Sequence, residues 1–338
     1  MLYIARMEEL EREVGALAES SGFSGVVRVD RGGETVLAKA YGLADRAHGI
    51  PNAVDTQFAI ASGTKGLTAL TVVSLIEEGS LALSTTARSV LGGDLPLIGG
   101  DVTVEQLLSH HSGIGDYVDE DAGGYDVDDY VMPVPVHELA TTEDYLAVLD
   151  GHPAKFPPGE RFAYCNSGYV VLALVAERTS GVPFHELVRQ RVSGPAGMDD
   201  TAFLRSDELP GRAAIGYVQA GGAWRTNVFH LPVRGSGDGG IYTTAADVAA
   251  FWDALFAGRI VSREWVAEML RARSDEPRYG LGFWLDATRD VAILEGLDAG
   301  VAFRSVHDPE RRLTYTVIAN AVPGAREVNR LLVARVME

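Results

Sequence analysis

The chain has 338 residues, a formal net charge of −18 and 46% hydrophobic residues, so it can form one large domain or two interleaved ones with a sizeable core. The acidic balance argues against nucleic acid or an anionic membrane as a partner, because both need a basic protein surface. A single cysteine excludes a disulfide framework and a cysteine-based metal site.

The N-terminal segment has apolar residues at helical spacing. Met7, Leu10, Val14 and Leu17 fall on one face, which predicts an amphipathic helix. The segment lacks the basic stretch and apolar stretch of a secretory signal. No apolar run approaches the roughly 18 residues of a membrane span. We therefore expect a cytoplasmic protein with no membrane span, unless a leader has been removed. The sequence leaves the oligomeric state open.

Strand-like segments lie near both ends of the chain. The pattern predicts a hairpin at 25–30 and 35–42, and further strands at 279–285, 291–294, 300–306 and 313–319. The middle, 85–235, is typical of helix and loop, and a last helix is expected at 325–336. We expect an α+β fold in which both chain ends form one antiparallel sheet flanked by helices, with a largely helical inserted region. The predicted domains are 1–85 plus 235–338, and 86–234, with the active site in the cleft between them.

The tetrapeptide Ser62-Gly63-Thr64-Lys65 starts a long apolar segment that should be helical and end near Gly79. Residues three apart share a helix face, so Ser62 and Lys65 should point the same way. Burial favours the neutral form of an amine, which would place a base beside a hydroxyl nucleophile. The alternative is a serine cap with a surface lysine one turn later.

A second candidate is the tripeptide Tyr164-Cys165-Asn166, which precedes an apolar helical segment at 170–178. Residues two apart on a loop can both point into one cleft. A phenol can relay a proton, and an amide offers both a donor and an acceptor. The alternative is a buried aromatic beside a turn-forming asparagine.

Together these motifs and their flanks resemble the serine β-lactamase and penicillin-binding-protein superfamily, most closely its class C-like branch. That branch includes D-alanyl-D-alanine carboxypeptidases, D-aminopeptidases, family VIII esterases and a few acyltransferases. Other matching segments are 40–44, 103–113, 156–159, 239–244 with Asp247, and 279–283. The resemblance implies a β-lactamase/transpeptidase-like fold, a small-molecule substrate, and no cofactor or metal ion.

The resemblance also implies roles. Ser62 would be the acylated nucleophile, and Lys65 and Tyr164 would form the base network, with the working base undecided. Asn166 would hold the acyl side of the substrate and help to position Lys65. Backbone N–H groups of Ser62 and Leu297 would form the oxyanion hole, where each donor is worth about 3–4 kcal/mol of barrier.

The third motif departs from the family pattern. The family has K-T-G or H-x-G on the edge strand, and this chain has Leu294-Glu295-Gly296 there. The glycine is kept, but Leu294 cannot bind a substrate carboxylate, and Glu295 would repel one if it faced the cleft. Arg304 on the next strand could compensate. The apolar Leu294 and the acidic Glu295 favour an esterase or amidase for small neutral or cationic substrates. A D-Ala-type carboxypeptidase or weak β-lactamase, an acyltransferase, and a non-catalytic acyl-binding or sensor protein remain alternatives.

Three other signals are interpreted as structural. The glycines at 235–240 match G-x-G-x-x-G, but the required strand and helix context is missing, so a close-packed turn beside the cleft is expected. His110 is expected to be a hydrogen-bonding corner residue and not a triad member. The acidic segment 116–130 is expected to be a solvated surface loop. The alternative is that this segment overhangs the cleft and selects substrates by charge.

Overall fold

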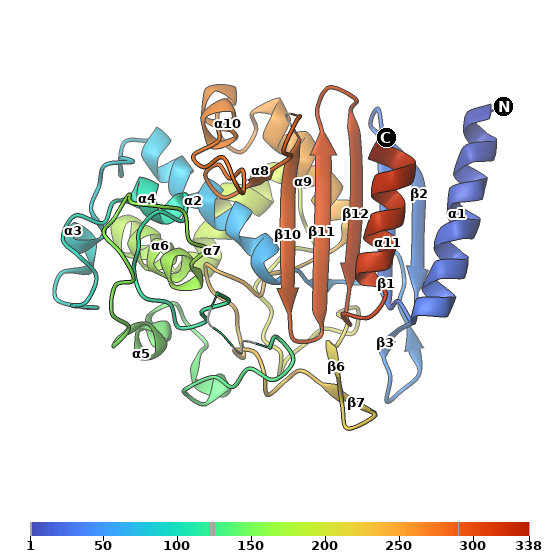
Figure 1. Cartoon of the computed structure of the whole chain (residues 1–338), viewed down its shortest axis with the longest axis horizontal. Helices are drawn as coiled ribbons and strands as arrows, with labels where there is room; N and C mark the ends of the chain where they lie inside the picture. Colours follow the sequence, from blue (N-terminus) through green and yellow to red (C-terminus); the bar gives the residue numbers. More distant parts are fainter. Residues whose placement is uncertain (1, 122, 124–125, 290, 338) are drawn as a thin grey trace.

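The computed structural model describes residues 2–121, 123, 126–289 and 291–337. An antiparallel sheet in the order β2-β1-β12-β11-β10-β9 forms its centre (Figure 1). Its strands are β1 (Gly25–Arg31), β2 (Glu34–Tyr41), β9 (Trp284–Leu285), β10 (Ala292–Asp298), β11 (Val301–Asp308) and β12 (Leu313–Ala319). The two chain ends meet where β1 pairs with β12, with Gly25 opposite Ala319. The predicted α+β fold, with one sheet built from both chain ends, is confirmed.

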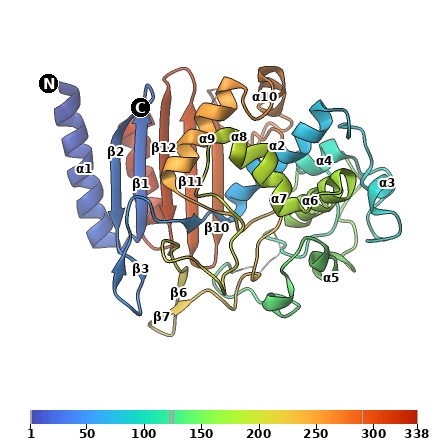
Figure 2. The same cartoon turned by 180° about the vertical axis from the view of Figure 1, so that it is seen from behind.

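Helices cover both faces of this sheet. The helices α1 (Leu2–Ser21) and α11 (Ala325–Leu332) lie on one face, and α2 (Thr64–Glu77) and α9 (Ala245–Ala257) lie on the other (Figures 1 and 2). Successive side chains of β1 point to opposite faces of the sheet and so pack against both helical layers. Val27 packs in the hydrophobic cluster that contains α1 residues, and Val26 packs in the cluster that contains α2 residues. The predicted N-terminal helix is confirmed, because its Leu10 and Val14 are buried against the sheet.

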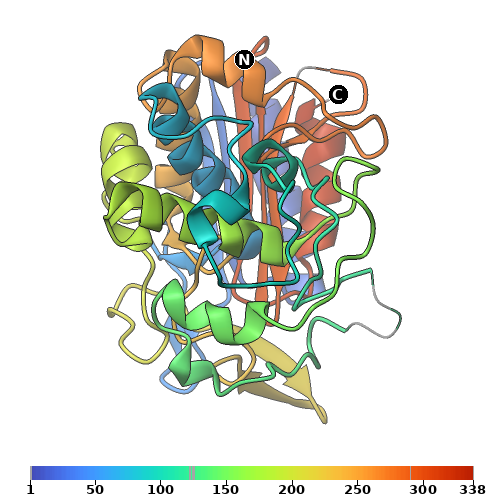
Figure 3. The ribbon, with the colours of Figure 1, turned by 90° about the vertical axis from the view of Figure 1, so that its left-hand side faces the viewer.

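The remaining helices gather beside the β10 edge of the sheet (Figure 3). They are α3 (Ala87–Leu91), α4 (Val104–Leu108), α5 (Leu146–Leu149), α6 (Asn166–Ser180), α7 (Phe184–Val188), α8 (Gly194–Ala196) and α10 (Arg263–Met269). Short 3-10 turns occupy Ala61–Gly63, Val136–Glu138 and Glu143–Tyr145, and π-helical turns occupy Arg189–Ser193 and Val333–Met337. Short strands are β3 (Leu43–Asp45), β4 (Ile50–Pro51), β5 (Phe58–Ala59), β6 (Tyr217–Ala220), β7 (Ala223–Thr226) and β8 (Tyr242–Thr243). The division into domains 1–85 plus 235–338 and 86–234 stays a prediction.

The strand predicted at 279–285 is wrong for most of its length, because only Trp284–Leu285 is a strand. Two glycines explain the difference. Gly282 has a φ of +89°, and a Cβ on Gly280 would lie 2.1 Å from the Met269 carbonyl oxygen. This backbone therefore bends and packs closely where a flat strand would not fit. Among the described helices, none has the length and apolarity needed to cross a membrane.

Candidate active site

Ser62 lies in a 3-10 turn, Ala61–Gly63, directly before α2 begins at Thr64. The sequence analysis expected Ser62 at the start of the helix itself. The tighter turn still points the Ser62 side chain towards Lys65, as expected. Lys65 Nζ lies 2.9 Å from Ser62 Oγ. Lys65 is 2% exposed, so it is not the surface lysine of the simpler alternative.

Two further acceptors hold the Lys65 amine. Its Nζ donates to Asn166 Oδ1 and to the Asp238 carbonyl oxygen, each at 2.8 Å. The three contacts come from the Ala61–Gly63 turn, α6 and the glycine-containing turn before β8. The Lys65 side chain is therefore fixed in direction by groups that are distant in the sequence.

Asn166 is the first residue of α6, and its placement depends on Asp116. The Asp116 carboxylate accepts the backbone N–H groups of Asn166 and Ser167, each at 2.8 Å. It thereby satisfies donors that the start of a helix leaves unpaired. The Asn166 side chain also donates to Glu120 Oε1 at 2.9 Å. The sequence analysis had assigned Asp116 to a surface loop and missed this role.

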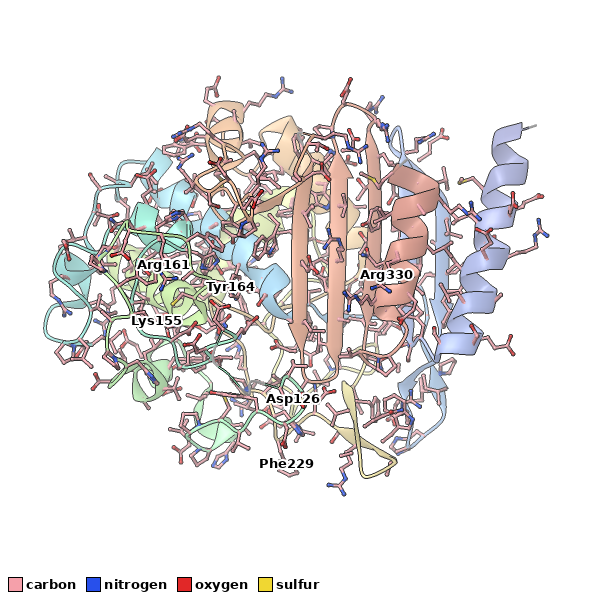
Figure 4. The ribbon with its side chains drawn as sticks, in the orientation of Figure 1. Asp126, Lys155, Arg161, Tyr164, Phe229 and Arg330 are labelled. Carbon is pink, nitrogen blue, oxygen red and sulfur yellow. The ribbon has the colours of Figure 1, made fainter. Side chains whose placement is uncertain are left out.

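Tyr164 lies on the side of the helical region that faces β10 (Figure 4). Its ring stacks on Trp284 with 5.8 Å between centroids, and its ring centroid is 4.9 Å from Lys65 Nζ. Burial raises the pKa of Tyr164 well above its usual value, and the Glu120 carboxylate adds to the rise. A hydrogen bond with Ser62 opposes the rise. The phenol is therefore neutral and adjacent to the nucleophile at neutral pH.

His110 is a structural residue, as the sequence analysis predicted. Its Nδ1 accepts the Cys165 backbone N–H at 3.0 Å, and its ring lies 4.4 Å from the Tyr164 ring. Burial lowers the pKa of His110 well below its usual value, so the ring is neutral. The histidine therefore supports the backbone that carries Tyr164 and Asn166.

The third motif lies on β10, beside the Ser62 turn. A Cβ on Gly296 would lie 2.2 Å from the Ile60 carbonyl oxygen and 2.8 Å from the Ser62 nitrogen, so only glycine fits. Leu297 follows on the strand edge and is 50% exposed. The side chain of Leu294 is 3% exposed and packs towards Gly66 of α2.

Two residues that were expected to contact substrate are placed elsewhere. Leu294 lies in the core, and Glu295 points to the opposite face of the sheet, where it pairs with Arg304. Neither lines the cavity at Ser62. The reason is the two-residue period of a strand, which turns Glu295 away from the face that carries Gly296. Arg304 is likewise engaged on that far face and does not compensate for a missing cation.

A cavity of about 930 Å³, which includes space open to solvent, contains Ser62 and Asn166. The acidic segment contributes Tyr117, Val118, Glu120, Val127 and Tyr130 to its wall. The expectation of a solvated loop is therefore wrong for Tyr117, which is buried, whereas Glu120 is exposed, and 122, 124 and 125 lie outside the described residues. Phe229, between two wall residues, is 82% exposed at the rim (Figure 4).

The sequence analysis missed two further acidic wall residues, Asp238 and Asp298. Asp238 is held by the Tyr117 hydroxyl, which donates to its carboxylate at 2.5 Å. Burial raises the pKa of Asp238 above its usual value. Strand alternation could have identified Asp298, because it is two residues beyond Gly296 and so shares its face.

The glycine-rich segment 235–240 forms the predicted close-packed turn beside the cleft. A Cβ on Gly235 would lie 2.1 Å from the Gly239 carbonyl oxygen, and both glycines line the cavity. Within the described part of the chain, no group of three or more acidic, histidine or cysteine side chains is arranged to hold a metal ion.

Comparison with known proteins gives matches over most of the chain. A sequence model of the Beta-lactamase family matches residues 10–337. Esterase EstB of Burkholderia gladioli is 31% identical over 315 residues, which cover 83% of this chain and 79% of the esterase. The crystal structure of a penicillin-binding protein from Bacillus halodurans superimposes with a TM-score of 0.89 and 35% identity, over 95% of this chain and 99% of that one.

A D-aminopeptidase of Cereibacter sphaeroides (strain ATCC 17029 / ATH 2.4.9) is 26% identical over 359 residues, which cover 97% of this chain and 63% of that protein. The matches to PbpX, named as a putative penicillin-binding protein, and to penicillin-binding protein 4*, both of Bacillus subtilis (strain 168), cover 62% and 58% of the lengths of those proteins. The chain thus spans about three fifths of the length of several relatives that it matches.

Proposed function

Because the chain belongs to the Beta-lactamase family, we propose that it is a serine hydrolase that forms an acyl-enzyme on Ser62. The favoured reaction is hydrolysis of small esters or amides that are neutral or cationic. The observation that carries the proposal is the 2.9 Å contact between Lys65 Nζ and Ser62 Oγ in a buried site. Relatives named as an esterase and a D-aminopeptidase support the reaction class.

Lys65 is the proposed base. A neutral amine has two N–H donors and one lone pair. The donors match the Asn166 Oδ1 and Asp238 carbonyl acceptors, each at 2.8 Å, which leaves the lone pair for the Ser62 hydroxyl. Lys65 Nζ takes the Ser62 proton as Oγ attacks the carbonyl carbon of the substrate.

Tyr164 is the proposed proton donor and not the base. Because burial raises the pKa of Tyr164 well above its usual value, the phenol keeps its proton at neutral pH. It can give that proton to the leaving oxygen or nitrogen as the bond to the acyl carbon breaks, and the Lys65 ammonium then restores the phenol proton. Water attacks the acyl-enzyme and gives one proton to the Lys65–Tyr164 network, which returns it to Ser62 Oγ.

The oxyanion formed in each step would be stabilised by the backbone N–H groups of Ser62 and Leu297. A side chain at Gly296 would collide with the Ser62 turn, so the glycine keeps these two segments close together. Fixed donors of this kind lower the barrier by about 3–4 kcal/mol each.

The charge of the cavity bears on substrate choice. Its described wall includes Glu120, Asp238 and Asp298 but no lysine or arginine. A substrate carboxylate would meet like charge there, which disfavours penicillins and peptides with a D-Ala terminus. A D-Ala-type carboxypeptidase or weak β-lactamase is therefore the second candidate.

The test combines labelling of Ser62 with ester turnover. A fluorophosphonate should label Ser62, as read by mass spectrometry of the digested protein. Hydrolysis of p-nitrophenyl butyrate should fall at least about a thousandfold in Ser62→Ala and Lys65→Met. The exposed Ser89→Ala is the matched control and should retain full activity.

Each alternative predicts a different result of this test. Full activity in Ser62→Ala would overturn the proposal. A stable adduct on Ser62 with no turnover of an ester, an anilide or a penicillin would favour the non-catalytic acyl-binding protein. Acyl transfer to an added alcohol or amine faster than to water would favour the acyltransferase.

A further inference from the structure

Asp298 has a carboxylate at the active site that no other described residue engages. Among the described residues, it has no hydrogen-bond or ion-pair partner. The other two acidic wall residues are engaged, since Asp238 accepts from the Tyr117 hydroxyl and Glu120 accepts from the Asn166 amide. The acceptor oxygens of Asp298 are therefore available to a ligand.

The position of Asp298 brings this carboxylate close to the nucleophile. It is the last residue of β10, on the same face as Gly296, which contacts the Ser62 turn. A Cβ on Gly239 would lie 3.7 Å from Asp298 Oδ2 and 3.5 Å from the Ala61 carbonyl carbon. Only the width of one small residue thus separates the carboxylate from the turn that carries Ser62.

The surroundings of Asp298 lack a compensating cation on the cavity wall. The described wall contains no lysine or arginine, and the Lys65 amine is already engaged with Ser62 Oγ, Asn166 Oδ1 and the Asp238 carbonyl oxygen. Burial raises the pKa of Asp298 to about 7; Lys65 opposes this rise, and Asp238 and Glu120 add to it. An incoming cation would relieve the repulsion among these carboxylates, because opposite charges attract strongly in a partly desolvated cavity.

We propose that Asp298 binds an ammonium group on the acyl part of the substrate, so that the preferred substrates are esters or amides of amine-bearing acids. This inference rests on the proposed function, because it assigns the substrate of the same Ser62 site. Asp298 is then a specificity-determining residue that contacts substrate, and the chemistry of Ser62 and Lys65 does not require it.

The test uses two esters that differ only in charge. The p-nitrophenyl esters of β-alanine and butyric acid have the same shape, with an ammonium group in one and a methyl group in the other. The wild-type protein should have the higher kcat/KM for the β-alanine ester. Asp298→Asn should lower that value by about tenfold to a hundredfold, as expected for a lost charge-assisted hydrogen bond, and should change the butyrate value less than threefold.

A control on the same strand removes an equal charge from the opposite face. Glu295→Gln should leave both esters unchanged, because Glu295 pairs with Arg304 away from the cavity. The wild-type preference for the β-alanine ester should also rise as the pH increases through about 7, where Asp298 loses its proton. Asp298→Glu should restore part of the preference.

The results separate this inference from the proposed function. An unchanged ratio of the two esters in Asp298→Asn, or no wild-type preference for the β-alanine ester, would overturn the ammonium site. Retained butyrate hydrolysis in Ser62→Ala would overturn the proposed function instead. An equal rate of fluorophosphonate labelling in Asp298→Asn and wild type shows that the variant is folded with an intact nucleophile.

Discussion

Replacement of Asp298 by asparagine should stabilise the protein at alkaline pH. The pKa of Asp298 is raised from its ordinary value of 3.8 to about 7, mainly because burial disfavours the charged form. The native state therefore keeps a proton that the unfolded chain has lost, and stability falls as the pH rises from about 4 to about 7. Above about pH 7 Asp298 is charged in the native state, and the full free-energy cost of burying that charge is present. Asparagine has the same shape and carries no charge.

The size of the gain follows from the two pKa values. The difference between 3.8 and about 7 corresponds to at most about 4 kcal/mol, since each tenfold change in an acid constant is worth about 1.4 kcal/mol. Water at the cavity mouth screens the carboxylate, so about 2 kcal/mol is expected. An unfolding entropy of about 2.1 cal/mol/K per residue converts this gain to roughly 3 °C for 338 residues.

The assay is thermal unfolding of wild type and Asp298→Asn at pH 8.5 and pH 5.5. The variant should unfold about 3 °C higher at pH 8.5, and the gain should fall to about half at pH 5.5. The exposed Asp253→Asn on α9 loses the same charge and should shift the midpoint by less than about 1 °C at either pH. Equal or lower stability of Asp298→Asn at pH 8.5 would refute the reasoning.

Three other substitutions test the supports of the site. Gly296→Ala places a Cβ 2.2 Å from the Ile60 carbonyl oxygen and should lower kcat about a hundredfold, so wild-type kcat would contradict the close-approach argument. Asp116→Ala removes the acceptor at the start of α6 and should lower the free energy of unfolding by about 1–2 kcal/mol and also reduce kcat. Unfolding in urea together with ester kinetics measures both, and an unchanged kcat would show that Asn166 is positioned without Asp116. Leu294→Lys buries an ammonium in the core and should destabilise the fold by several kcal/mol. A stable variant that gained nitrocefin hydrolysis would show instead that this position faces the substrate.

Local patterns in the sequence were sufficient for most of the fold. The apolar spacing of Leu10 and Val14 predicted the first helix, and the hairpin at 25–42 follows from alternation around a glycine turn. The strand predicted at 279–285 failed because Gly282 has a positive φ and packs against α2, and Gly280 packs closely against α10, which the local pattern does not describe.

The sequence by itself determined the partners Ser62 and Lys65, because three-residue spacing at a helix start leaves little freedom in direction. Motif order and flanks also pointed to Tyr164 and Asn166, and the structure brings all four side chains to one site. Only the tertiary structure decided the electrostatics of that site. Asp116, Asp238 and Asp298 come from three separate segments, and burial and long-range packing turn them into a helix cap, an engaged carboxylate and an available one. Such contacts between distant segments depend on the packing of whole elements, which spacing along the chain does not encode.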